Sequence, residues 1–175
     1  EGVVLDDGRV MVCGGEQFKP YVYTFPTAAP SPPNPILLRS AEVYDPASGA
    51  WTLSQSNQGN GMFFLRRDHQ AAKLKNGHVL VSGGWDGTTI WDSCEQYDPG
   101  LDSFSLHQAT MQRGRYEHTM TILSNGNPLV SGGVSPGGIE NTMEVLDLKA
   151  GGWVLTQNTI GGPVSVPGVG GGRGS

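Results

Sequence analysis

Two histidines with identical neighbours are the residues best suited to chemistry in this sequence. His69 lies three residues after Arg66, and His118 lies three residues after Arg115. An imidazole beside charged groups is suited to acid–base catalysis or metal binding. Because the pattern recurs at equivalent positions, it instead favours a structural role, in which each histidine is packed or hydrogen-bonded at the start of an inner strand.

Three glutamates also recur, each beside an element that bears arginine: Glu42, Glu95 and Glu144. Buried or half-buried Arg–Glu pairing between strands is therefore expected. The sequence has no H-E-x-x-H, phosphate-loop or EF-hand motif. Asp6-Asp7-Gly8 and Asp86-Gly87 fit hairpin turns better than calcium sites. We accordingly predict no catalytic residue, no metal ligand and no cofactor.

The two cysteines, Cys13 and Cys94, match no zinc-binding spacing. A single disulfide between them and two buried thiols are both open, because pairing cannot be deduced from sequence. Cys13 precedes a double glycine, where Ser82 and Ser131 stand in later copies, which indicates a packing position.

Internal repeats organise the chain and must position these side chains. A hydrophobic run ending in a double glycine occurs three times, at Gly14-Gly15, Gly83-Gly84 and Gly132-Gly133. A later phrase contains the recurring glutamate and, further on, an aromatic residue: Trp51, Phe104 and Trp153. Both landmarks of that phrase recur after 53 and then 49 residues, and this agreement fixes the register of the repeat.

Each repeat predicts four short antiparallel strands. The third copy has apolar segments at 118–123, 128–133, 141–148 and 153–157, separated by turn residues such as Asn125-Gly126. Asn-Gly and Asp-Gly pairs are strong hairpin signals because both positions tolerate positive φ. A sheet this small cannot bury both faces alone, so neighbouring copies must stack, as the blades of a β-propeller do.

These features together resemble the kelch repeat. The resemblance rests on the double glycine, the phrases "VYDP" and "QYDP", the late aromatic, and "RRDH" and "RYEH" before the first strand. It covers 3–156 and is specific for fold, implying an all-β protein of about three kelch-type blades in an incomplete ring. It is more distantly similar to the propeller of galactose oxidase and glyoxal oxidase.

We expect the first blade at 1–52, the second at 66–105, the third at 115–156, and a Gly-rich tail or linker at 157–175. The first blade starts without the opening arginine and histidine and carries a proline-rich insertion at 16–39. Because propellers typically use about 4–8 blades, we expect further blades from the same chain or from another chain.

Antiparallel alternation places the long loops on one face. That loop face gathers aromatic side chains, which are candidates for recognition or for sealing loops onto blades. The binding candidates are Tyr21, Tyr23, Phe25, Phe63, Phe64, Trp85 and Trp91. Trp85 stands apart because Glu16 and Val134 hold the matching positions, so repetition does not explain it.

Composition and charge limit the classes of partner that the chain can bind. A net charge of −5 offers no basic stripe for nucleic acid, and no apolar run reaches the ~18 residues that a membrane span needs. Low charge and the segment "TAAPSPPNP" at 27–35 are typical of extracellular proteins. We therefore expect a non-catalytic extracellular module that binds proteins or glycans, with a structural role in a coat, matrix or filament.

The enzymatic alternative is a fragment of an extracellular copper radical oxidase. That family holds copper with two tyrosines and two histidines, one tyrosine being crosslinked to cysteine. The residues of those types here are Tyr44, Tyr97, Tyr116, His69, His118 and Cys94. Tyr44 and Tyr97 fall at repeat positions, and no motif of that family aligns with this sequence.

Overall fold

The computed structural model describes residues 1–17, 35–54 and 61–156. These residues form β-strands and turns without a helix, as the all-β prediction requires. Accordingly, no helix in this part of the chain is long and apolar enough to span a membrane. The predicted aromatic candidates Tyr21, Tyr23 and Phe25 lie outside the described residues.

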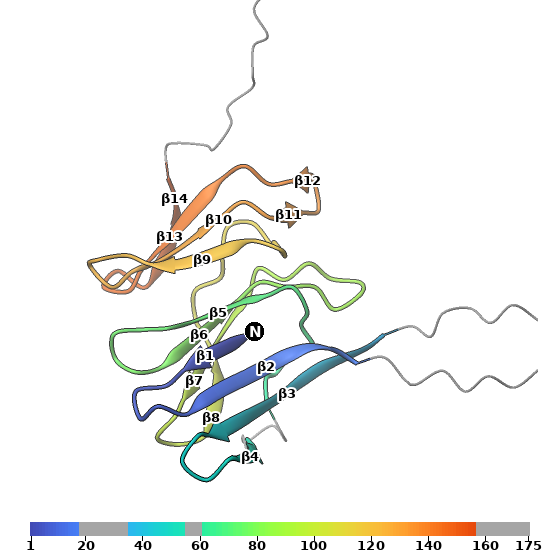
Figure 1. The fold of residues 1–175 in the computed structure, drawn as a ribbon. Helices are drawn as coiled ribbons and strands as arrows, with labels where there is room; N and C mark the ends of the chain where they lie inside the picture. Colours follow the sequence, from blue (N-terminus) through green and yellow to red (C-terminus); the bar gives the residue numbers. More distant parts are fainter. Residues whose placement is uncertain (18–34, 55–60, 157–175) are drawn as a thin grey trace, which may run out of the picture.

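Three four-stranded antiparallel sheets follow one another along the chain (Figure 1). The first contains β1 (Gly2–Val4), β2 (Val10–Gln17), β3 (Ile36–Asp45) and β4 (Ala50–Leu53). The second contains β5 (Gln70–Lys73), β6 (Val79–Ser82), β7 (Cys94–Asp98) and β8 (Ser103–Leu106). The third contains β9 (Thr119–Ile122), β10 (Pro128–Ser131), β13 (Met143–Asp147) and β14 (Gly152–Leu155).

The strands of each sheet are paired in chain order, as expected for hairpins joined by tight turns. Gly8, Gly77 and Gly126 occupy equivalent turns, and each has a positive φ of 85–97°. These are the Asp-Gly and Asn-Gly pairs that the sequence places between apolar runs. The turn chemistry therefore sets where each blade folds back on itself.

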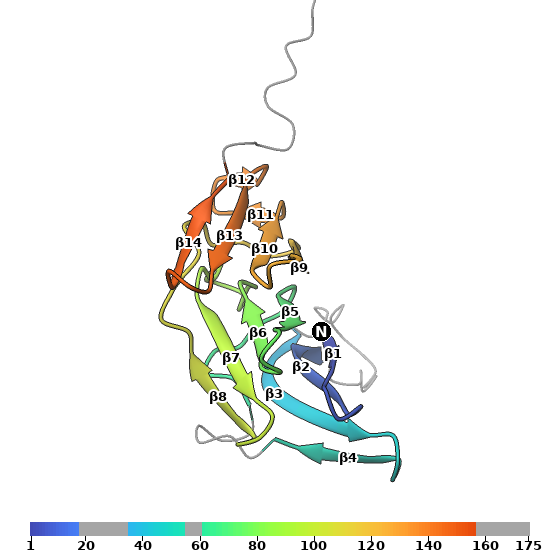
Figure 2. The same ribbon diagram turned by 90° about the vertical axis from the view of Figure 1, so that its left-hand side faces the viewer.

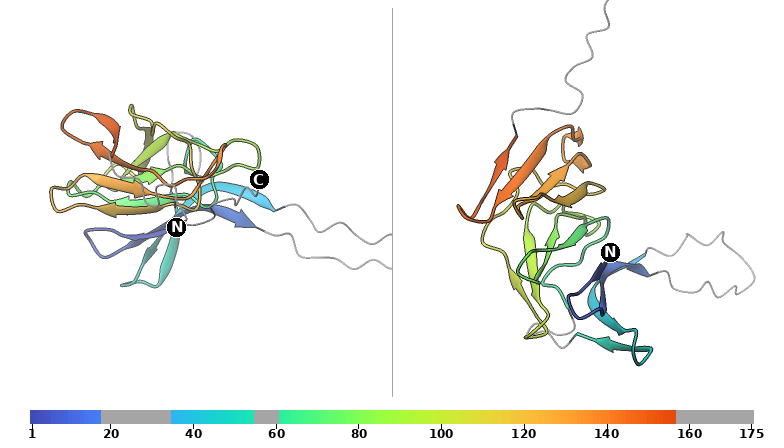
Figure 3. Two further views of the ribbon diagram at one scale, coloured as in Figure 1. Left: turned by 90° about the horizontal axis from the view of Figure 1, so that it is seen from above. Right: turned by 60° about the vertical axis from the view of Figure 1, so that its left-hand side comes forward.

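The sheets stack face to face in a curved row, which does not close into a ring in the described part of the chain (Figures 2 and 3). The first strands lie side by side, since β1 contacts β5 and β5 contacts β9. One apolar cluster fills the space between the first and second sheets, including Met11, Val43, Val81 and Tyr97. A second cluster, including Leu80 and Trp153, lies between the second and third sheets.

Two details differ from the sequence prediction. In the first sheet the double glycine does not end the strand, because β2 continues to Gln17 and pairs Gly15 with Leu38 across a register shift. The ends of the insertion therefore extend the hairpin, whereas β6 and β10 stop directly before their glycines. In the third sheet the connection at 134–140, between the predicted strand segments 128–133 and 141–148, contains a small hairpin of β11 (Val134–Ser135) and β12 (Gly138–Ile139).

Candidate functional site

A buried arginine holds the second sheet together at the loop face. The Arg66 and Glu95 side chains are both 0% exposed and form an ion pair of 3.1 Å between Nε and Oε1. Arg66 also donates to the carbonyl oxygens of Gly83 and Ser93, at 2.5 and 3.0 Å. The Glu95 carboxylate accepts from the backbone N–H groups of Phe63 and Phe64, at 2.7 and 3.2 Å. Both buried charges are therefore hydrogen-bonded as well as paired, which burial requires.

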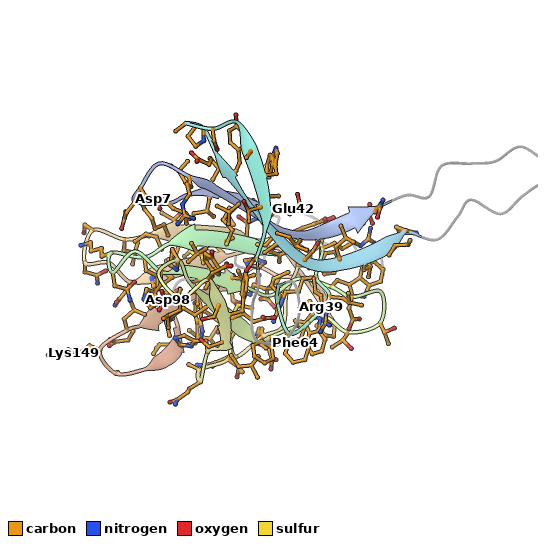
Figure 4. All side chains as sticks on the ribbon, turned by 90° about the horizontal axis from the view of Figure 1, so that it is seen from below. Asp7, Arg39, Glu42, Phe64, Asp98 and Lys149 are labelled. Carbon is orange, nitrogen blue, oxygen red and sulfur yellow. The ribbon has the colours of Figure 1, made fainter. Side chains whose placement is uncertain are left out.

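The third sheet repeats this arrangement with Arg115 and Glu144, whose side chains are likewise 0% exposed and 2.6 Å apart. Glu42 is the equivalent residue of the first sheet, but it is exposed and has no ion-pair partner among the described residues. Figure 4 shows Glu42 on β3 of the first sheet. Among the described residues, no arginine contacts Glu42 in the way that Arg66 contacts Glu95 and Arg115 contacts Glu144.

Two aromatic side chains of the loop face lie beside the buried arginine of the second sheet. Phe64 stacks on Trp91 with ring centroids 4.4 Å apart, and the Arg66 guanidinium lies 5.5 and 5.8 Å from the two ring centroids. Phe63 packs against the first apolar cluster. The third sheet has an ion pair in the place of the Phe64–Trp91 stack, formed by Arg113 and Glu140 at 3.6 Å. Phe64 and Trp91 therefore contact each other and the Arg66 guanidinium within the second sheet, and their role in binding a partner stays a prediction.

The double glycines contact the backbone of the next sheet. Gly15 N–H donates to the carbonyl oxygen of Arg66 at 2.7 Å, and Gly84 N–H donates to that of Arg115 at 2.8 Å. A Cβ atom on Gly83 would lie 2.3 Å from the Arg115 oxygen, and Gly83 has a φ of +61°. Glycine is needed here both for its backbone conformation and for the close approach of the neighbouring sheet.

The repeated histidines form a further contact between neighbouring sheets, and the contacts that link two neighbouring sheets are called a joint below. His118 Nε2 lies 2.9 Å from Ser82 Oγ, and His69 Nε2 lies 3.6 Å from Cys13 Sγ. Both rings are buried. The residue before the double glycine in one sheet therefore contacts the histidine of the next, which gives these histidines a place in the architecture.

Acid should weaken the fold through these two histidines. Burial lowers the pKa of His69 and of His118 to about 3, whereas a histidine in the unfolded chain titrates near 6.5. Above pH ~6.5 both states are neutral, but below it only the unfolded chain gains protons, so the free energy of unfolding falls from pH ~6.5 towards pH ~3. We expect His118→Gln to remove about one proton from the slope between pH ~7 and ~5, as measured by urea unfolding. An unchanged slope would contradict this assignment.

The structure describes two buried thiols and not a disulfide between Cys13 and Cys94. Cys13 belongs to the apolar cluster between the first two sheets, and Cys94 belongs to the cluster between the second and third. Burial raises the pKa of each thiol to about 12. We expect no reaction with a thiol reagent at pH ~8 in the folded protein, and two reactive thiols in denaturant, whereas a disulfide would give none in either condition.

The late aromatic residues also differ between sheets. Phe104 and Trp153 are 4% and 6% exposed, whereas Trp51 is 56% exposed. Tyr97 packs against Phe104, and Tyr44 packs against Trp51, at centroid distances of 4.9 and 5.1 Å. The aromatic pair of the first sheet lies on the face that no described sheet covers.

The residues considered for copper are held in separate contacts. Tyr97 donates its hydroxyl to Asp102 at 2.9 Å, and Tyr116 stacks on Trp85. Each of the two histidines contacts a different sheet through the residue before the double glycine. Within the described ranges, no three His, Cys, Asp or Glu side chains are grouped so that they could hold a metal ion.

A hollow of about 360 Å³ remains on the loop face. It is lined by Pro35, Leu37, Arg67, Trp85, Asp86 and Gly87. The Arg67 guanidinium lies 4.4 Å from the centroid of the Trp85 ring and pairs with Glu16 at 2.8 Å. Figure 4 places Phe64 and Arg39 at this end of the sheets and the turn residues Asp7, Asp98 and Lys149 at the other. An aromatic ring beside an arginine and a carboxylate offers both stacking and hydrogen bonding to a ligand.

Sequence reasoning selected Trp85 but missed its neighbours. Arg67 and Tyr116 each follow the arginine that opens a repeat, and this shared position was the available signal. Leu37 and Pro35 belong to the end of the insertion, where proline content alone indicated a loop.

Comparison with known proteins supports a distant relationship. No family model matches this sequence. It is 32% identical over 102 residues to "Spermatocyte protein spe-26" of Caenorhabditis elegans. The matched region covers 58% of this chain and 15% of that relative's length. The chain thus matches a small part of the relative, and its four-stranded antiparallel sheets are consistent with propeller blades.

Proposed function

We propose that this chain is part of a kelch-type β-propeller that acts as a non-catalytic binding module for protein or glycan. The observation that carries the proposal is the hollow beside Arg67 and Trp85, which lies on the loop face of sheets joined by buried apolar clusters. A rigid scaffold that presents loops is a common basis for recognition.

The hollow combines three kinds of contact. Trp85 supplies an apolar ring that is partly exposed, Leu37 supplies an aliphatic wall, and Asp86 supplies a carboxylate at the rim. Asp86 Oδ1 already accepts from the backbone N–H groups of Thr88 and Thr89, which fixes the carboxylate in place. Such fixed groups favour a ligand with an apolar face and polar edges, a description that fits a sugar ring or a peptide.

The proposed setting is extracellular, with a structural or assembly role in a coat, matrix or filament. It is supported by the low charged fraction of 15% and by the proline-rich segment at 27–35. Partners would be proteins or glycans, or further blades of the same or another chain.

Binding to immobilised polysaccharides and extracellular-matrix proteins tests the proposal. We expect the full chain to bind at least one of these probes, and Trp85→Ala to weaken that binding about tenfold or more. Trp51→Ala is the matched control, because Trp51 is 56% exposed and does not line the hollow. Equal binding by the wild type and Trp85→Ala would show that the hollow is not the binding site. Stoichiometric copper in the purified chain would contradict a non-catalytic module.

A further inference from the structure

The positive charge at the loop-face hollow is already balanced by carboxylates. Arg67 is the cation among the residues that line the hollow. Its Nη1 pairs with Glu16 Oε2 at 2.8 Å, and its Nε lies 3.6 Å from Asp68 Oδ2. The guanidinium also lies 4.4 Å from the centroid of the Trp85 ring. The charge of Arg67 is therefore compensated within the chain before a ligand enters.

The Asp86 carboxylate, which lines the same hollow, has no such counter-charge. Its Oδ1 accepts from the backbone N–H groups of Thr88 and Thr89, at 2.9 and 2.7 Å. Among the described residues, no basic side chain forms an ion pair with Asp86, and its Oδ2 has no hydrogen-bond partner. The turn thus holds a carboxylate in a fixed position with one oxygen able to accept from a ligand. Carboxylates accordingly outnumber cations at the hollow.

An apolar wall lies beside this carboxylate. Pro35 and Leu37 line the hollow together with Trp85, and all three residues are partly buried. Leu37 Cδ1 lies 3.6 Å from the position of a Cβ at Gly87, which places the wall next to the turn that holds Asp86. A ligand group that matches both features has an aliphatic part and a terminal cation, and lysine and arginine side chains combine the two. The volume of about 360 Å³ is within the usual range of ligand sites.

We infer that the hollow takes a lysine or arginine side chain from a protein partner, in a segment where an apolar residue adjoins the basic one. The ammonium or guanidinium group donates to Asp86 Oδ2, and the aliphatic stem packs on Pro35 and Leu37. The inference rests on the proposed function, because it uses the same hollow, and it narrows the ligand from protein or glycan to a basic protein segment. A neutral glycan leaves the Asp86 charge without a partner, and an anionic glycan adds to the excess of carboxylates.

The occupant is a separate protein and not a second copy of this chain. The chain carries a net charge of −5, so two copies repel each other. Several of its partly exposed basic side chains already form ion pairs within the chain: Arg9, Lys73 and Arg113. A partner with unpaired basic side chains on its surface has the complementary charge and meets neither obstacle.

A peptide with the sequence Gly-Ser-Leu-Lys-Ser-Gly, capped at both ends, is a direct probe, because the caps leave the lysine as its charged group. Added to the full chain labelled with ¹⁵N, it should shift the amide signals of Gly87 and Thr88 in a saturable way. The same peptide with an acetylated lysine keeps the stem without the charge, and it should bind about tenfold more weakly. That difference should shrink when NaCl is raised from ~50 to ~500 mM, because salt screens the ion pair. Absence of the shifts at millimolar lysine peptide would overturn the inference.

Asp86→Asn tests the carboxylate with little change of shape. The amide oxygen can still accept from Thr88 and Thr89, so the turn is kept while the charge is removed. We expect this variant to bind the lysine peptide about tenfold more weakly than the wild type does. Asp147→Asn is the matched control, because Asp147 Oδ1 also accepts from two backbone N–H groups of a turn but does not line the hollow. Equal losses in the two variants would contradict the inference, since they would reflect the overall charge of the chain.

Binding to the immobilised probes separates this inference from the proposed function. Loss of binding to a matrix protein in both Trp85→Ala and Asp86→Asn supports the inference. If Trp85→Ala weakens the binding and Asp86→Asn does not, the hollow binds its ligand without a basic side chain, so the inference fails and the proposed function stands. If neither variant changes the binding, both fail. Self-association of the wild-type chain that Asp86→Asn abolishes would also overturn the inference, since a second copy would then be the occupant.

Discussion

Replacing Arg66 by leucine should lower the free energy of unfolding by about 3–5 kcal/mol, the usual cost of breaking a buried ion pair on one side. The variant leaves the Glu95 carboxylate fully buried with two backbone N–H donors and no cation. It also leaves the carbonyl oxygens of Gly83 and Ser93 without the Arg66 donor. The midpoint of urea unfolding, followed by circular dichroism, measures the loss.

The control is an ion pair that differs in burial. Arg9 pairs with Asp7 at 2.7 Å, but their side chains are 37% and 52% exposed, so Arg9→Ala should change stability by less than about 1 kcal/mol. The double variant Arg66→Leu with Glu95→Leu should recover part of the loss, because it removes the orphaned charge. If Arg66→Leu were no worse than Arg9→Ala, the buried pair would not hold the second sheet.

The repeats made the sheets predictable because strand pairing depends on local patterns. Alternating apolar residues and Asn-Gly or Asp-Gly turns specify each hairpin within about ten residues of chain. The hairpin of β11 and β12 could have been predicted in the same way, because Ser135-Pro136-Gly137-Gly138 is a strong turn sequence. The continuation of β2 past Gly15 was not, because it depends on pairing with Leu37 and Leu38 across the insertion.

The side-chain contacts between sheets were harder to predict than the sheets. An aromatic residue type does not reveal whether its ring faces a ligand or a neighbouring sheet, so Phe64 and Trp91 could not be assigned from sequence alone. Comparison with the positions 49 residues later would have helped, because Arg113 and Glu140 at those positions form an ion pair. Two positions that carry complementary residues in more than one repeat indicate a contact.

Comparison of matching positions in the repeats also indicates which glycine is more sensitive to substitution. Gly83→Ala should destabilise the protein by roughly 2–5 kcal/mol, since a side chain at φ +61° costs about 1–2 kcal/mol and overpacking adds about 1–3 kcal/mol. The overpacking arises because the new Cβ would lie 2.3 Å from the Arg115 carbonyl oxygen. Differential scanning calorimetry or urea unfolding measures this loss.

Gly132→Ala is the matched variant, because it has the same backbone conformation without the neighbouring sheet. Its φ is +66° and its nearest contact would be at 3.7 Å, so only the backbone cost of about 1–2 kcal/mol should remain. The difference between the two variants measures the close approach of one sheet to the next, and equal losses would show that the joint tolerates a methyl group.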